Sequence, residues 1–117
     1  RIEERTVLLV RCGEEVGIRR RPKTGLLAGL WELPSLEGRT GANELRARLS
    51  ARGWQVEKLL SLRGAKHVFT HVEWHMSGFE VTLAEKPEGL TFVTPQALRE
   101  SYVLPSAFRA FLSVLEE

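Results

Sequence analysis

The stretch Arg21-Pro-Lys-Thr-Gly-Leu-Leu-Ala-Gly-Leu-Trp-Glu-Leu-Pro34 carries the strongest local information about the fold. Its two glycines and closing proline predict a structured loop with a short strand at its end. Upstream, Thr6–Val10 has the apolar run of a buried strand, and Val16–Ile18 follows the Gly13 turn as its hairpin partner. This half of the chain therefore predicts paired strands followed by a long ordered loop.

Downstream of that loop, helices alternate with strands. Ala42–Arg52 is predicted to be helical because Ala42, Leu45 and Leu49 share one face, and Gly53 ends it. The other expected elements are strands at Val56–Leu62 and His67–Leu83 (the second broken at Ser77-Gly78 into a hairpin), a short strand at Leu90–Val93, a helical turn from Thr94-Pro95 to Arg99, and a last helix from Pro105 with Phe108, Phe111, Leu112 and Leu115 at helical spacing. The fold class is therefore α/β or α+β.

Length and composition limit the classes of protein that fit. The 117 residues suit one domain, 1–117, and no run of 18 apolar residues is present, so no membrane partner is expected. Cys12 is the only cysteine, which excludes an internal disulfide and a multi-cysteine metal site and favours a cytoplasmic location. The chain starts at Arg1 rather than Met, which favours a piece of a longer protein.

Charge is unevenly distributed along the chain. The net charge is +2, and residues 1–58 hold 12 Lys or Arg against 8 Glu. This surplus favours anionic partners. All acidic residues are Glu, so chemistry that needs Asp is excluded within this sequence.

Three segments together are similar to the C-terminal domain of A/G-specific adenine DNA glycosylases of the MutY type. They are Arg21–Pro34, His67-Val-Phe-Thr-His71 and Leu104-Pro-Ser-Ala-Phe-Arg-Ala-Phe111, and the similarity extends over nearly the whole chain. The resemblance implies a Nudix-like fold, a mixed β-sheet flanked by helices. Nudix hydrolases share the Gly-Leu-Trp-Glu-Leu-Pro element, whereas His-x-Phe-Thr-His is the discriminating one.

The resemblance also implies a function in base excision repair. Such a domain recognises 8-oxoguanine mispaired with adenine in double-stranded DNA, and an N-terminal catalytic domain with a [4Fe-4S] cluster removes the adenine. The catalytic residues and the cluster ligands lie outside this sequence, so this fragment alone is expected to be inactive, without a cofactor of its own. A monomer in the bacterial cytoplasm is expected.

The main alternative is an active Nudix hydrolase, which needs several carboxylates on one helix to bind Mg²⁺. When the signature is anchored on Gly53-Trp54, three of its glutamates become Ala47, Ser50 and Ala51. A second register from Gly38 finds Glu44 and Arg52 correctly spaced but meets Gly53 and Val56 at two carboxylate positions. The catalytic Nudix box is therefore degenerate in either register.

Three histidines, His67, His71 and His75, recur every four residues and raise the question of zinc. On one strand the first two lie roughly 13 Å apart, too far for a shared ion. No metal site is predicted.

Phe69, Thr70 and His71 are the candidate 8-oxoguanine-binding residues that the resemblance implies. The oxidised base has an N7–H donor and an O8 acceptor, and a Thr hydroxyl with its own main-chain N–H can satisfy both. Many relatives have Ser where this chain has Thr70. Phe69 is expected to stack or wedge, and His71 to bind a base edge or phosphate. The alternative is an ordinary strand end with a core Phe.

The four cations Arg19, Arg20, Arg21 and Lys23 are candidate phosphate contacts. Solvated surface charge is the other interpretation. A catalytically inactive protein-interaction module is the runner-up function, and an exposed patch of Leu26, Leu27 and Leu30 would favour it.

Overall fold

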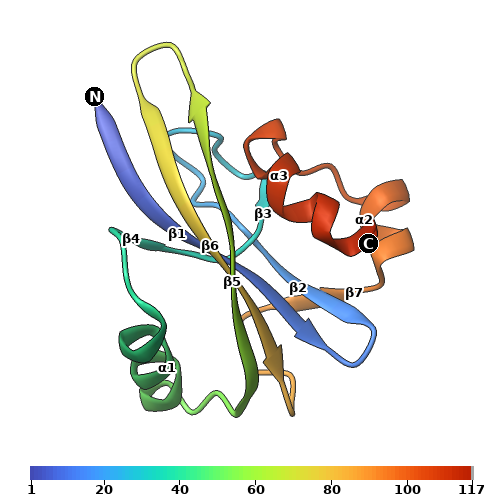
Figure 1. Ribbon diagram of the computed structural model, residues 1–117. Helices are drawn as coiled ribbons and strands as arrows, with labels where there is room; N and C mark the ends of the chain where they lie inside the picture. Colours follow the sequence, from blue (N-terminus) through green and yellow to red (C-terminus); the bar gives the residue numbers. More distant parts are fainter. Residues whose placement is uncertain (117) are drawn as a thin grey trace.

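A computed structural model describes residues 1–116, and a mixed sheet of seven strands forms its centre (Figure 1). The strand order is β3-β2-β1-β6-β5, with β4 paired to β1 and β7 paired to β2. Only β1 and β6 are parallel among these pairs. The strands are β1 (Ile2–Cys12), β2 (Glu15–Arg20), β3 (Trp31–Glu32), β4 (Ser35–Glu37), β5 (Val56–Val68), β6 (Glu73–Leu83) and β7 (Thr91–Val93).

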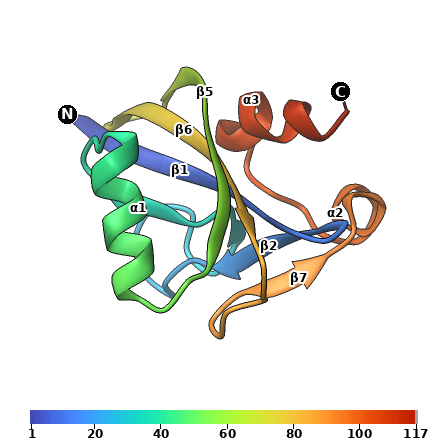
Figure 2. The ribbon, with the colours of Figure 1, turned by 60° about the horizontal axis from the view of Figure 1, so that its bottom comes forward.

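Helices cover both faces of this sheet, which gives the molecule two cores. Figure 2 shows α1 (Ala42–Ala51) on one side and α2 (Pro95–Ser101) with α3 (Arg109–Leu112) on the other. Because side chains alternate along a strand, successive residues of β1 enter different cores. Leu8 packs with Leu45 of α1, whereas Val7 packs with Phe108 and Phe111. The expected mixed α+β class is confirmed.

The predicted hairpin at Ser77-Gly78 is wrong. β6 runs through both residues without a break, and the chain turns instead at residues 69–72, between β5 and β6. Gly78 is buried where the ring of Phe111 lies against the strand, and an added Cβ would be 2.8 Å from Phe111 Cδ1. The glycine therefore allows close packing in a strand and does not make a turn.

The predicted ends of the helices are mostly confirmed. α1 ends at Ala51, followed by Gly53 at φ +85°, and the Thr94 hydroxyl caps α2 by accepting from Ala97 N–H at 3.1 Å. The last helix differs from the prediction, because α3 is a single turn between two 3₁₀ segments, Ser106–Phe108 and Ser113–Glu116. No helix in residues 1–116 has the length and apolar character to cross a bilayer.

Candidate nucleic-acid interface

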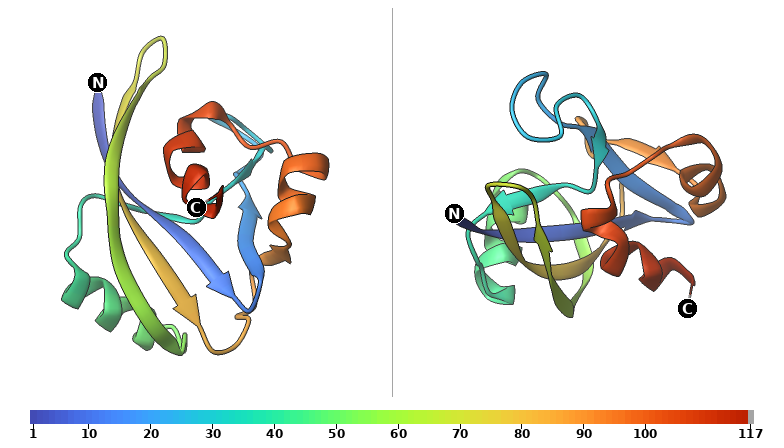
Figure 3. Two further views of the ribbon diagram at one scale, coloured as in Figure 1. Left: turned by 45° about the vertical axis from the view of Figure 1, so that its right-hand side comes forward. Right: turned by 90° about the horizontal axis from the view of Figure 1, so that it is seen from above.

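The β5–β6 turn, residues 69–72, projects at one end of the sheet beside the N-terminus (Figures 1 and 3). Phe69 N–H donates to Val72 O at 2.7 Å and closes the turn. Thr70 and His71 are exposed at its tip. Among the described residues, neither the hydroxyl nor the main-chain N–H of Thr70 has a hydrogen-bond partner. The three residues predicted from the sequence therefore share one turn, and Thr70 and His71 are its exposed members.

Phe69 anchors this turn to the body of the domain. Its half-buried ring packs edge-on against His67 and Trp74, with centroid separations of 4.7 and 5.0 Å. An aromatic side chain held on two sides loses most of its rotamer freedom, which restricts the backbone that carries it. Phe69 therefore acts in the structure as a support for Thr70 and His71.

The first residues of the chain brace the other side of the turn. Glu73 N–H donates to Arg1 O at 2.8 Å, and the α-amino group of Arg1 donates to His71 O at 3.3 Å. Ile2 and Val68 lie opposite Glu73 on the neighbouring strands and are 61% and 68% exposed. Together with the turn they line an open cavity of about 450 Å³. The site is thus a shallow, open depression in which the polar tip lies beside two exposed aliphatic side chains.

Glu73 is the nearest acidic group to the turn. A hydrogen bond with His75 lowers the pKa of Glu73, and the charges of His75 and Lys66 act in the same direction. The carboxylate is therefore kept ionised beside the cavity. The Glu73 carboxylate accepts a hydrogen bond from His75 on the same strand, and not from Thr70 or His71 at the tip of the turn.

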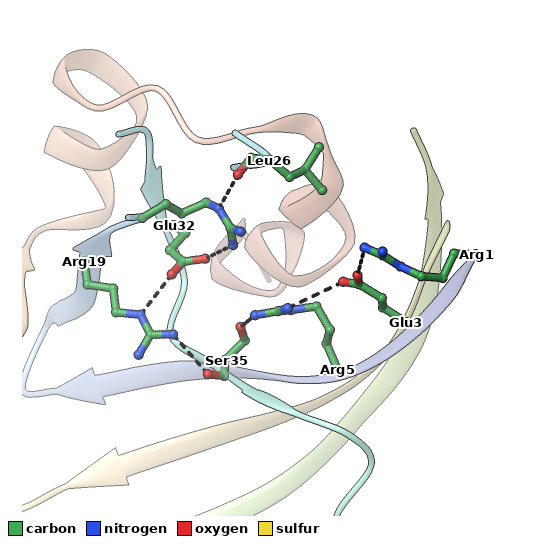
Figure 4. A network of polar contacts seen from close by, with 8 residues as sticks. Arg1, Glu3, Arg5, Arg19, Leu26, Glu32 and Ser35 are labelled. Carbon is green, nitrogen blue, oxygen red and sulfur yellow. Dashed lines mark hydrogen bonds and ion pairs between the residues drawn. The ribbon is translucent and has the colours of Figure 1, made fainter. Parts of the chain in front are cut away.

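The predicted phosphate cluster divides into two parts, and Figure 4 shows the first. Arg19 Nε donates to Glu32 Oε2 at 2.9 Å, and Arg21 Nη1 donates to Glu32 Oε1 at 2.8 Å. Arg21 also donates to Leu26 O at 2.9 Å, and Arg19 to Ser35 O at 3.0 Å. The Glu32 side chain is only 3% exposed, so both arginines neutralise a buried carboxylate.

The other two cations face outward. The Arg20 guanidinium lies over the Trp31 ring at 4.7 Å and donates to Gly29 O at 3.2 Å. Lys23 is exposed, and within residues 1–116 it makes no ion pair. Arg20 and Lys23 are thus the members of the cluster most available to an external phosphate.

Helix α1 presents no set of carboxylates. Ala47, Ser50 and Ala51 are all exposed on it, and the only acidic side chain in the helix is Glu44. Glu44 accepts from Thr40 Oγ1 at 2.8 Å, a contact within the helix start. The residues present here do not suit a Mg²⁺–diphosphate complex, which needs several hard oxygen ligands.

The histidines do not lie along one strand as the sequence suggested. His67 is on β5, His71 is in the turn and His75 is on β6. In the part of the chain that the structure describes, no three His, Cys or Glu residues come together as a potential metal site.

Three features of this region are absent from the sequence-based prediction. Glu32 was not singled out, although a carboxylate inside Leu-Trp-Glu-Leu-Pro signals a buried charge in need of cationic partners. Trp74 is 1% exposed, and nothing in the sequence signals its contact with Phe69. The pairing of Arg1 with the turn spans some 70 residues and leaves no local signal.

This chain belongs to the NUDIX domain family, whose model matches residues 6–114. The predicted Nudix-like fold is thereby confirmed. Among solved structures, it is similar to the C-terminal domain of mouse MUTYH, crystallised with human PCNA, with a TM-score of 0.75 and 22% identity over 99% of this chain and 89% of that one.

Structures of MutT proteins share the same fold. The MutT structure from work on Aliivibrio salmonicida and Vibrio cholerae has a TM-score of 0.67 and 17% identity, covering 98% of this chain and 97% of that one. The MutT protein of Bacillus halodurans has a TM-score of 0.66 and 19% sequence identity, covering 98% of this chain and 83% of that one. At these identities the similarity concerns the fold alone.

Proposed function

We propose that this chain recognises 8-oxoguanine opposite adenine in double-stranded DNA, as the recognition domain of an A/G-specific adenine DNA glycosylase. Cleavage of the glycosidic bond belongs to a catalytic domain with a [4Fe-4S] cluster outside this sequence. The observation that carries the proposal is the open turn, in which the hydroxyl and N–H of Thr70 have no partner among residues 1–116.

The chemistry of the oxidised base fits that turn. Compared with guanine, 8-oxoguanine changes N7 from an acceptor to a donor and adds an acceptor at O8. The Thr70 hydroxyl accepts from N7–H while its main-chain N–H donates to O8. His71 beside it is exposed and supplies a ring nitrogen for a base edge or a phosphate.

Arg1 lies beside the same turn, where it is hydrogen-bonded to His71 and Glu73. A monomeric, bacterial cytoplasmic glycosylase remains part of the proposal.

The alternatives receive less support from the described residues. Hydrolysis of nucleotides through α1 needs carboxylates where Ala47, Ser50 and Ala51 stand. The protein-interaction alternative needs an exposed patch of Leu26, Leu27 and Leu30. Only Leu30 is exposed, at 44%, because the other two pack against the core.

The test is to compare Thr70→Ala with the unchanged chain in binding to two duplexes. One contains 8-oxoguanine opposite adenine and the other guanine opposite adenine, and fluorescence anisotropy gives both Kd values. We expect the preference for the oxidised duplex to fall by about two- to tenfold, the effect of one net hydrogen bond. Thr91→Ala, an exposed threonine on β7, is the matched control and should change neither value.

Other results would oppose the proposal. Equal losses on both duplexes would assign Thr70 a general docking role, and an unchanged chain without preference would exclude base recognition by this turn. Metal-dependent turnover of oxidised dGTP would favour a hydrolase instead.

A further inference from the structure

Trp74 on β6 occupies an unusual position behind the recognition turn. The side chain is 1% exposed, and its indole N–H has no hydrogen-bond partner among the described residues. Burial of an unpaired donor costs stability, so a phenylalanine would suit a purely apolar environment better. The reason for an indole must therefore lie in what surrounds its ring.

Two guanidinium groups lie over that ring. Arg5 Cζ is 4.9 Å and Arg21 Cζ is 5.3 Å from the ring centroid. Among aromatic side chains, the indole attracts cations most strongly. A tryptophan thus holds two cations that a phenylalanine would hold less well.

Both arginines are fixed by other elements. Arg21 is bound to Glu32 of β3 and to Leu26 O, while Arg5 of β1 donates to Ser35 Oγ at 2.8 Å. Burial, followed by the charge of Arg21, lowers the pKa of the Arg5 guanidinium. The two guanidinium groups repel each other, and the carboxylates of Glu32 and Glu3 offset part of this repulsion. The Trp74 ring lies within cation–π distance of both cations.

The opposite contact of Trp74 leads to the turn. Its ring meets Phe69 edge-on at 5.0 Å, and Phe69 closes the turn through its N–H to Val72 O. A continuous series of contacts therefore runs from Glu32 through Arg21 and Trp74 to the backbone beside Thr70.

We propose that Trp74 is a positioning residue for the β5–β6 turn, held in place by Arg5 and Arg21 and acting through Phe69. This inference rests on the proposed function in so far as the turn binds the oxidised base. At 1% exposure Trp74 does not contact DNA, so its effect is to pre-organise the turn before binding. Its loss costs discrimination between bases more than general affinity for duplex DNA.

The experiment observes the turn and base discrimination separately. The unchanged chain has five phenylalanines, so labelling with 4-fluorophenylalanine gives five ¹⁹F resonances, and Phe69→Leu identifies that of Phe69. Trp74→Phe and Trp54→Phe each add a sixth resonance, which is assigned as the one absent from the unchanged chain. Trp74→Phe and Trp74→Leu are compared with Trp54→Phe, a half-buried tryptophan of the other core. The same proteins are titrated with the 8-oxoguanine and guanine duplexes.

We expect Trp74→Leu to shift and broaden the Phe69 resonance and to lower the preference for the oxidised duplex by about two- to tenfold. Trp74→Phe should do the same to a smaller extent, and Trp54→Phe should do neither. Arg5→Gln removes one of the two cations over the ring, so its effects on the Phe69 resonance and on base preference should resemble those of Trp74→Phe. It replaces Trp74→Leu in both measurements if that variant does not fold.

An unchanged Phe69 resonance in the folded variants overturns the inference, as does an equal loss of affinity for both duplexes. If the unchanged chain shows no base preference, the proposed function fails. The Phe69 resonance then still decides whether Trp74 positions the turn.

Discussion

Glu32 is the residue on which the cationic loop depends. It is a buried carboxylate shared by Arg19 and Arg21, and the loop after Arg21 folds back so that Leu26 O and Leu30 O accept from Arg21. Removal of one member of a buried ion pair leaves the partner charges uncompensated. The same carboxylate indirectly orders Trp74 through Arg21.

We therefore predict that Glu32→Gln lowers the free energy of unfolding by about 1–3 kcal/mol, because the amide keeps one acceptor but loses the charge. Urea denaturation followed by circular dichroism measures the change. Glu37→Gln, an exposed glutamate of β4 with no ion pair among residues 1–116, should stay close to the unchanged chain. Equal stability of the two variants would contradict a structural role for the Glu32 cluster.

At the scale of elements, α3 packs directly on β6 through Phe111 and Gly78. The ring of Phe111 rests on Gly78, where a side chain would overlap it. This close approach brings the single turn of α3 onto β6, the strand that follows the β5–β6 turn. A short helix is thus fixed by packing, since four residues supply little helical stability of their own.

Gly78→Ala should destabilise the domain by about 1–3 kcal/mol through overpacking against Phe111. Differential scanning calorimetry would show a lower Tm. Gly41→Ala is the comparison, because an added Cβ there meets nothing within 4 Å. Gly41 is the N-cap of α1, where alanine is less favourable than glycine, so a smaller loss of stability is expected there than at Gly78. A Gly78→Ala protein as stable as Gly41→Ala would mean that α3 readily moves off the sheet.

At the scale of the whole molecule, internal ion pairs limit the number of cations that can bind the phosphates of DNA. Folding leaves fewer cations of residues 1–58 unpaired, because Arg19 and Arg21 bind Glu32 and Arg11 pairs with Glu80 at 2.8 Å. Arg20 and Lys23 stay outward on the loop between β2 and β3. DNA affinity should therefore depend on only part of the cluster seen in the sequence.

Replacement of Arg20 and Lys23 together by Gln should flatten the slope of log affinity against log salt by about 0.9 for each phosphate that the variant no longer neutralises. Anisotropy titrations over a series of salt concentrations give this slope. The matched control is Arg48→Gln with Arg52→Gln, two exposed arginines at the end of α1. If the salt dependence flattens in Arg19→Gln and not in the Arg20/Lys23 variant, the phosphate contacts are made by the ion-paired arginines, and the prediction is wrong.

Features that depend on near neighbours in the chain can be predicted from the sequence alone. The β1–β2 hairpin, α1 with its stop at Gly53, the Thr94 cap and the missing carboxylates of α1 all follow from residue type and short-range periodicity. The sequence also shows that Phe69, Thr70 and His71 are adjacent, but it predicts a strand from His67, so their position in a turn does not follow from it.

Features that depend on distant partners emerge only in the folded chain. Ser77-Gly78 has the residue types of a turn, but Phe111 makes Gly78 a site of close packing, and the turn forms at residues 69–72. Likewise, the sequence does not distinguish the four neighbouring cations, whereas in the structure two of them, Arg19 and Arg21, form ion pairs with Glu32. Local propensity acts over a few residues, whereas burial and ion pairing join residues far apart in the chain, so only tertiary contacts distinguish these roles.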